Sequence, residues 1–169
     1  MVELTVVDVR TVQGGEYPLV LLRATEAEGP YRGKVLPIAV GPAEAQAIAL
    51  ALRKRETPRP MTHDLFVQSL TALGVTVERV VITEMRDRVF YGELHLRSGS
   101  GVQVLSCRPS DGIAIALRTD ATLSAGEEVM DEHCVEDPDA EPAEEEAEQV
   151  IEEFRSFIED ISPDDFREH

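Results

Sequence analysis

Three short polar clusters stand out in the sequence, each at the start of a segment with helical spacing of apolar residues. They are Gly41-Pro42-Ala43-Glu44, Pro58-Arg59-Pro60-Met61-Thr62-His63-Asp64 and Arg108-Pro109-Ser110-Asp111. The first turn of a helix has free backbone N–H groups and a positive partial charge, so each cluster is a candidate anion or phosphate site. Proline at the first helical position with an acid two residues later is also an ordinary helix start, which is the favoured role of Glu44.

The third cluster combines a cation, a hydroxyl and an acid in one turn. Arg108 and Ser110 can bind a phosphate oxygen through charge-assisted hydrogen bonds. For Asp111 a structural role at the helix start and a functional role are equally favoured.

The middle cluster has the residue types of an acid–base or metal site. We predict Thr62 as the N-cap, with His63 and Asp64 in the first turn. An acid is expected there and a histidine is not, because the helix dipole disfavours protonated imidazole. A neutral histidine beside an aspartate can act as a general base or a metal ligand. The alternative is that His63 hydrogen-bonds a neighbouring strand while Asp64 caps the helix.

The basic run Arg53-Lys54-Arg55 lies just upstream, with Arg59 four residues further on. Cations are favoured at the C-terminus of a helix by the dipole, so a solvated structural role comes first. The functional alternative is a contact patch for the phosphate backbone of a nucleic acid, next to His63.

The charge of the 169-residue chain is unevenly distributed along the sequence. The formal net charge is −17, but Met1 to Gly126 carries 14 acidic and 14 basic residues, whereas Glu127 to His169 carries 19 acidic and 2 basic residues. Acidity therefore argues against nucleic-acid binding for the tail only.

The sequence also lacks the signs of several other protein classes. Cys107 and Cys134 have no partner at the spacing of a zinc site or a disulfide framework. No apolar stretch approaches the ~20 residues that span a bilayer. We therefore expect a cytoplasmic protein without a membrane span.

The elements that position the clusters are predicted from apolar periodicity and turn residues. Strands are expected at 2–12, 17–25, 34–40, 75–83, 89–97 and 102–107, with helices at 43–54, 62–73 and 109–117. Two segments match without gaps at a spacing of 67 residues, as from Pro42 to Pro109. We interpret this as duplicated β-β-β-α repeats at about 2–54 and 75–118, with the helix at 62–73 between them. The predicted fold class is α+β, with an antiparallel or mixed sheet and helices packed on it.

The composition changes sharply near the end of the second repeat. We predict one domain at 1–131 and an acidic, disordered linker at 132–149, which has little to bury. Residues 150–169 are predicted as a short amphipathic helix, whose apolar residues include Val150, Phe154, Phe157 and Ile161.

The segments VLPIAVGPAEAQAIALAL, PRPMTHDLFVQSLTALGVTVERVVI and RPSDGIAIALR, in this order, resemble the bifunctional nuclease domain family of bacteria and plants. The resemblance extends over nearly all of Val2 to about Asp131. The acidic tail, which ends in FRSFIEDISPDDF, resembles a C-terminal extension of actinobacterial members.

The resemblance implies hydrolysis of both RNA and DNA with little sequence preference. The positions that fall on the family's motifs are Glu44, Arg59, Thr62, His63, Asp64, Arg108, Ser110 and Asp111. Family members usually have an acidic and a small residue before the Arg-Pro-Ser-Asp motif, whereas Ser106 and Cys107 stand there in this chain.

The nuclease hypothesis gives these residues three roles. The catalytic residues are His63, Asp64 and Asp111. Asp64, Asp111 and Glu44 are expected to hold Mg²⁺ or Mn²⁺, since a metal-assisted nuclease needs clustered carboxylates. The residues expected to bind RNA or DNA are Arg53, Lys54, Arg55, Arg59, Arg108 and Ser110.

The alternative hypothesis is a non-enzymatic dimeric scaffold or regulatory module. Its acidic C-terminal helix has an apolar face that needs a partner, either the domain, a second copy or another protein. In a third possibility, the tail covers the basic segment Arg53 to Arg59 as a nucleic-acid mimic. A homo-oligomer, namely a dimer, is also expected.

Overall fold

Eight strands join in one mixed sheet, and four helices accompany it in the part of the chain that the structure describes. This computed structural model describes residues 1–11, 17–26, 28–137 and 139–140. The strands are β1 (Val2–Arg10), β2 (Leu19–Ala24), β3 (Lys34–Ala39), β4 (Thr76–Arg86), β5 (Val89–Ser98), β6 (Gly101–Cys107), β7 (Thr122–Ala125) and β8 (Val135–Glu136). The helices are α1 (Pro42–Leu52), α2 (Thr62–Ala72), α3 (Pro109–Ala116) and α4 (Glu127–His133). The α+β class is confirmed.

The sheet contains two antiparallel three-stranded meanders, one from each predicted repeat. The strand order is β6-β5-β4-β7-β1-β2-β3-β8. Strand β7 lies between the meanders, antiparallel to β1 and parallel to β4. Each meander is followed by a helix, α1 or α3, which is the element order that the duplication predicts. Strands β7 and β8 and helix α4 were not expected from the sequence.

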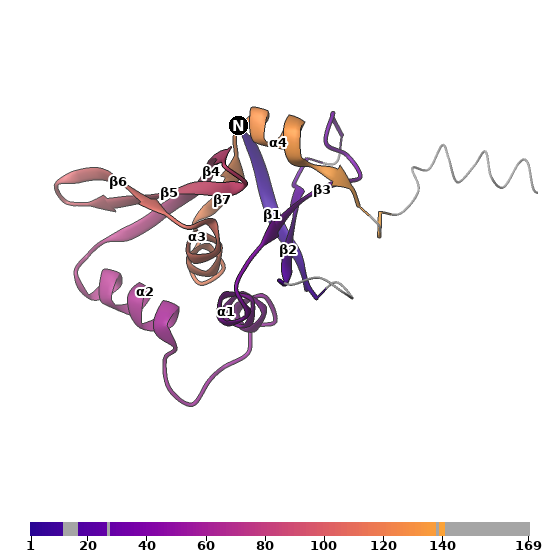
Figure 1. Cartoon of the computed structure of the whole chain (residues 1–169). Coiled ribbons are helices and arrows are strands. Elements are labelled where there is room, and N and C mark those ends of the chain that lie inside the picture. The colour runs from indigo at the N-terminus through magenta and orange to yellow at the C-terminus, as the bar shows by residue number, and fades with distance from the viewer. Residues whose placement is uncertain (12–16, 27, 138, 141–169) are drawn as a thin grey trace, which may run out of the picture. The chain divides into compact units, whose positions relative to one another are not determined.

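Helices α1 and α3 pack against each other, and α2 packs against α3 (Figure 1). Helix α3 also contacts β4 and β5, while α1 contacts β1. The core between the helices and the sheet is aliphatic and includes the fully buried residues Leu22, Leu36, Ile48, Ile82 and Ile113. The starts of α1, α2 and α3 are thus held close to one another.

The starts of α1 and α3 are set by proline. Pro42 and Pro109 occupy the first turn, where the missing N–H group costs no hydrogen bond.

Helix α3 also packs very closely on the sheet at Gly112. A Cβ atom there would lie 2.6 Å from Cγ1 of Val80. Only glycine allows this approach without a shift of the buried valine.

The structure places the start of α2 one residue before the predicted cap. The N-cap is Met61 rather than Thr62, and the Met61 N–H donates to Oδ2 of Asp64 at 2.8 Å. Asp64 therefore caps the helix from its third position. The helix ends before Gly74, whose φ of +70° suits glycine. No side chain of α2 is fully buried.

The folded unit extends to Asp137, past the predicted boundary at residue 131. Strand β8 pairs with β3, and the buried Asp137 accepts a hydrogen bond from Nε of Arg23 at 2.9 Å. The start of the predicted linker is thus part of this unit. The helix predicted at 150–169 lies outside the described residues. Among the described helices, none has the length and apolar character to cross a membrane.

Candidate functional site

The first and third polar clusters meet at the guanidinium group of Arg108. Its Nε and Nη2 donate to the two carboxylate oxygens of Asp111 at 2.7 and 2.9 Å. Its Nη1 lies 2.9 Å from Oε1 of Glu44. One cation therefore links the start of α1 to the start of α3.

The middle cluster joins them through His63. The Nε2 atom of His63 lies 3.3 Å from Oδ1 of Asp111. The imidazole is largely buried, at 16% exposure, while the Asp111 side chain is 30% exposed. When Nε2–H donates to the carboxylate, Nδ1 is the unprotonated nitrogen and can accept a proton. His63 and Asp111 therefore form a dyad suited to general-base chemistry.

The carboxyl group of Asp111 is held ionised by its neighbours. Burial raises its pKa, but hydrogen bonds from Arg108 and His63 outweigh burial and hold the pKa below the usual 3.8. The same hydrogen bond with Asp111 raises the pKa of Arg108. An ionised Asp111 orients the imidazole of His63 and stabilises it when it becomes protonated.

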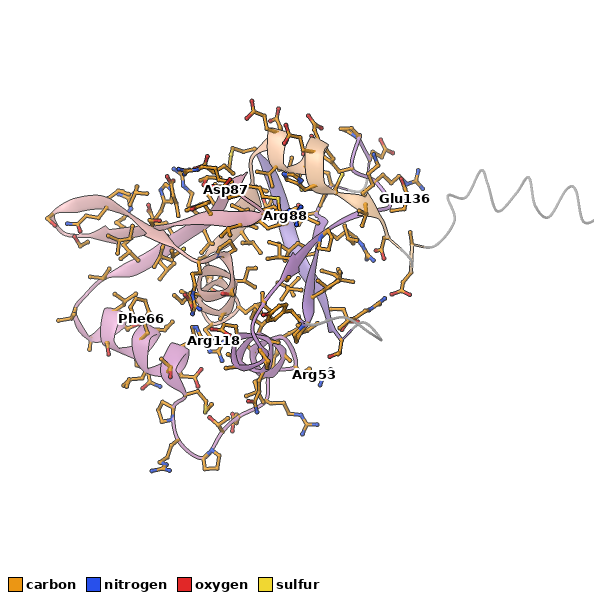
Figure 2. All side chains as sticks on the ribbon, in the orientation of Figure 1. Arg53, Phe66, Asp87, Arg88, Arg118 and Glu136 are labelled. Atoms are coloured by element: carbon orange, nitrogen blue, oxygen red, sulfur yellow. The ribbon has the colours of Figure 1, made fainter. Side chains whose placement is uncertain are left out.

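Asp64 has a different partner, Arg118, which the sequence analysis did not single out. The Nε atom of Arg118 donates to Oδ1 of Asp64, while its Nη1 and Nη2 donate to the carbonyl oxygens of Ala114 and Ala47 at 2.8 and 3.1 Å. Figure 2 shows Arg118 between α1, α2 and α3. The only sequence signal is a cation at the end of α3, where the first repeat has Ala51.

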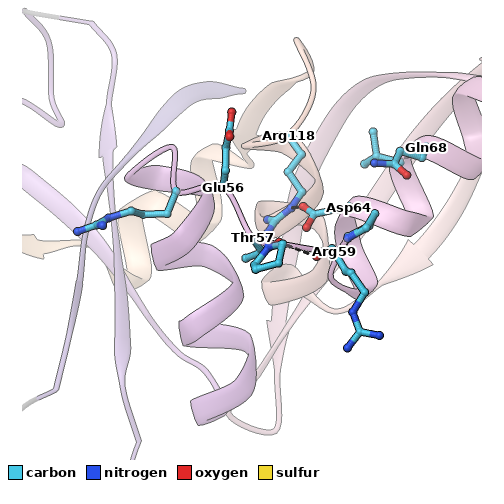
Figure 3. A pocket seen from close by; sticks show the side chains of 10 residues that line it. Glu56, Thr57, Arg59, Asp64, Gln68 and Arg118 are labelled. Carbon is cyan, nitrogen blue, oxygen red and sulfur yellow. Dashed lines mark hydrogen bonds and ion pairs between the residues drawn. The ribbon is translucent and has the colours of Figure 1, made fainter.

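The role of Asp64 in this structure is to join helices. The hydrogen bond from Arg118 holds the pKa of Asp64 below 3.8, and the N–H of Met61 adds to this effect. The carboxylate faces Arg118 (Figure 3). The structure thus pairs His63 with Asp111 and pairs Asp64 with Arg118.

A pocket of about 480 Å³ lies beside this ion pair, and we call it the basic pocket. Arg55, Arg59 and Arg118 line it together with Asp64. Glu56 lines it as well, so three cations stand against two carboxylates, and the remaining positive charge suits a phosphate backbone. The other two members of the predicted patch, Arg53 and Lys54, are exposed at the end of α1.

A second pocket of about 620 Å³ lies where both repeats meet, and we call it the apolar pocket. Its walls come from the end of β3, the start of α1, the β4–β5 hairpin and the start of α3. Glu44, Arg108 and Ser110 line it. Some of the predicted site residues therefore line one or the other of these two pockets, whereas His63 and Asp111 line neither.

The three carboxylates predicted to hold a metal are engaged with arginines. Glu44 and Asp111 pair with Arg108, and Asp64 pairs with Arg118. Within the described residues, no group of three or more His, Cys, Asp or Glu side chains is placed to hold an ion. A divalent cation needs several oxygen ligands together, so this arrangement does not fit one. The Mg²⁺ or Mn²⁺ requirement stays a prediction.

The cysteine that precedes the third cluster stands where family members usually have the small residue, and Ser106 stands at the acidic position. Burial raises the pKa of the Cys107 thiol to about 11, so it is neutral at pH 7. Cys107 packs against the core beneath α3. The position is structural in this chain.

Comparison with known proteins agrees with the resemblance. The family model described as the bifunctional nuclease domain matches residues 20–138. An uncharacterized protein of Mycobacterium tuberculosis is 38% identical over 172 aligned positions, which cover 99% of each chain. Bifunctional nuclease 1 of Oryza sativa subsp. japonica is 33% identical over 87 residues, 50% of this chain and 26% of the rice protein. The chain belongs to the bifunctional nuclease domain family.

Proposed function

We propose that this protein hydrolyses phosphodiester bonds in RNA and DNA with little sequence preference. The observation that carries the proposal is the contact of His63 with Asp111 beside the guanidinium group of Arg108. The family assignment and the name of the rice relatives, bifunctional nuclease, support the same activity.

In the proposed reaction, His63 is the general base. Its free ring nitrogen takes a proton from a water molecule, whose oxygen attacks the phosphorus atom, and the P–O bond to the leaving sugar oxygen breaks. The leaving oxygen takes a proton from solvent. Asp111 stabilises the imidazolium ion that forms. A water nucleophile serves DNA as well as RNA, because it needs no 2′-hydroxyl group.

Arg108 and the basic pocket bind the phosphates in this proposal. Arg108 makes three N–H contacts to Asp111 and Glu44, and its side chain is 64% exposed. A guanidinium group has five N–H donors, so two remain for a phosphate oxygen. Arg53, Lys54, Arg55 and Arg59 contact the backbone on either side, and binding should weaken steeply with salt.

The test is cleavage of end-labelled single-stranded RNA and DNA by the purified full chain. We expect His63→Gln and Asp111→Asn each to lower the rate by at least about 100-fold, since general-base catalysis contributes this much. Arg79→Gln, at an exposed position of β4, is the control. Cleavage that is unchanged in both site variants, with melting temperatures near wild type, would refute the proposal. Parallel reactions with Mg²⁺, Mn²⁺ or EDTA test the metal requirement.

Three further expectations accompany the proposed function. They are a homodimer, a protein partner for the C-terminal helix and a cytoplasmic location. A full chain that cleaves neither RNA nor DNA under any of these conditions would favour the non-enzymatic interaction module.

A further inference from the structure

The apolar pocket has the size and lining of a ligand site. Its volume of about 620 Å³ lies within the usual range for such sites, which are mostly apolar with a few polar groups. Leu19, Ile38 and Val40 line it from the first repeat, and Met85 and Phe90 line it from the second. The charged side chains of the lining are Glu44, Arg88 and Arg108.

Ser110 is the polar group of the pocket that most clearly lacks a partner. The residue is 8% exposed and lines the pocket. No hydrogen bond joins its hydroxyl group to any described residue, yet no fully enclosed side-chain oxygen in the described residues is unpaired. The Ser110 oxygen is therefore open to the pocket. An unpaired hydroxyl group at the wall of the pocket can hydrogen-bond a ligand atom.

Arg88 supplies a cation that no carboxylate of the described residues neutralises. It lies in the turn between β4 and β5, where Asp87 and Arg88 both have positive φ, 50° and 64° (Figure 2). Its guanidinium group makes no ion pair with the described residues, whereas Arg108 pairs with Glu44 and Asp111. A free guanidinium group at the pocket is suited to a phosphate.

We propose that the apolar pocket holds one nucleobase of the nucleic-acid substrate, with the adjacent phosphates against Arg88 and Arg108. This inference rests on the proposed function. Arg108 lines the pocket and contacts Asp111, which contacts His63, so a phosphate bound by Arg108 next to the base would lie near the dyad. The Ser110 hydroxyl group can donate or accept a hydrogen bond, and therefore suits the edge of any base. The pocket thus explains how a nucleic-acid strand is bound without sequence preference.

The experiment measures binding of two single-stranded DNA oligonucleotides to the full chain at low salt. One strand is intact, and the other has the same backbone with abasic sites. We expect the wild type to bind the intact strand roughly tenfold more tightly, the effect of one base held against apolar groups. Equal binding of both strands would overturn the inference.

Variants in the pocket identify the groups responsible. Ser110→Ala should lower the preference for the intact strand by about threefold, and Ser110→Thr should retain it, because threonine keeps the hydroxyl group. Arg88→Asn should weaken binding of both strands alike, since a phosphate contact does not depend on the base. Arg32→Asn removes the same charge from an exposed turn that does not line the pocket, and should have a smaller effect. A base preference unchanged in Ser110→Ala would overturn the role of this hydroxyl group.

The inference and the proposed function fail in different ways. If both strands bind equally while the chain still cleaves nucleic acid, the inference of a base site is wrong and the nuclease proposal is retained. If base-dependent binding is found without any cleavage, the base site is retained and the nuclease proposal is wrong. If neither strand binds, both are overturned.

Discussion

The two predicted repeats begin their helices alike but use them differently. Gly41 and Arg108 precede proline at matching positions, and Glu44 matches Asp111. The Glu44 carboxylate folds over Gly41, where an added Cβ atom would overlap its Oε2. At the matching position, Arg108 extends its guanidinium group to both acids. The start of α1 thus contributes only an acid, while the start of α3 carries the cation of the candidate site.

The two helices also differ at the matching positions near their ends. Arg118 follows α3 and ties three helices together, whereas Ala51 stands at the matching position of α1. The inserted helix α2 packs on α3, so His63 reaches Asp111. The two predicted repeats therefore share the arrangement of their helix starts, but the contacts of the candidate site centre on the helix start of the second.

The largest effect on stability is expected at Arg118. Arg118→Met removes the ion-pair partner of Asp64 and a donor to the carbonyl oxygens of Ala47 and Ala114, in a place where the arginine is 10% exposed. We expect the free energy of unfolding to fall by about 3 kcal/mol, because the remaining charge is partly buried and unpaired. Chemical denaturation measures it.

A matched charge loss on the surface is the control. Arg79→Met, at an exposed position of β4, should change the free energy of unfolding by less than about 0.5 kcal/mol. Equal losses in the two variants would show that Arg118 does not link the helices. The structural difference between the ends of α1 and α3 would then have no effect on stability.

The second prediction sets the two matching acids against each other in cleavage. Asp111→Asn should lower the cleavage rate by at least about 100-fold, because the dyad loses the charge that stabilises protonated His63. Glu44→Gln should lower the rate only about fivefold, since an amide still accepts a hydrogen bond from Arg108. Single-turnover cleavage of labelled RNA measures both rates. Similar losses of cleavage rate in the two variants would indicate that Glu44 and Asp111 contribute equally to cleavage.

Most of the first 120 residues could be predicted from the sequence, because their elements follow simple periodic patterns. The strands of both meanders and helices α1, α2 and α3 lie close to their expected positions. Helix α4 and strand β8 were missed, since their acidic composition hides the buried Val129 and Met130. Composition alone therefore gave a domain boundary that was too early.

The site was only partly predictable because its geometry depends on tertiary packing. Local helix-start chemistry pointed to His63 and Asp111, and the structure brings these together. The same chemistry placed Asp64 with them, but its partner Arg118 is 54 residues away in sequence. Arg88, in a turn between strands, has no local pattern that predicts a place at the apolar pocket. Contacts between distant segments decided each of these outcomes.

The third prediction concerns how closely the two helices pack on the sheet. Gly112 in α3 matches the buried Ala45 in α1. Gly112→Ala forces a methyl group against the buried Val80 and should destabilise the protein by about 2 kcal/mol. Ala45→Gly should cost about 1 kcal/mol, the ordinary difference in helix propensity. Thermal unfolding of both variants measures the contrast, and a neutral Gly112→Ala would mean that α3 is free to move away from the sheet.

The smallest expected effect lies at the end of α1. Lys54, one residue past the C-cap Arg53 of this helix, has a φ of +50°, a conformation that favours glycine, whereas Arg118 at the same place after α3 has no positive φ. Lys54→Gly should therefore raise the free energy of unfolding by about 1 kcal/mol, because the backbone strain is relieved. Lys54→Ala removes the same charge but keeps the strain, so it should give no gain. Denaturation of the two variants isolates the backbone effect, and a gain of equal size in both would assign it to charge instead.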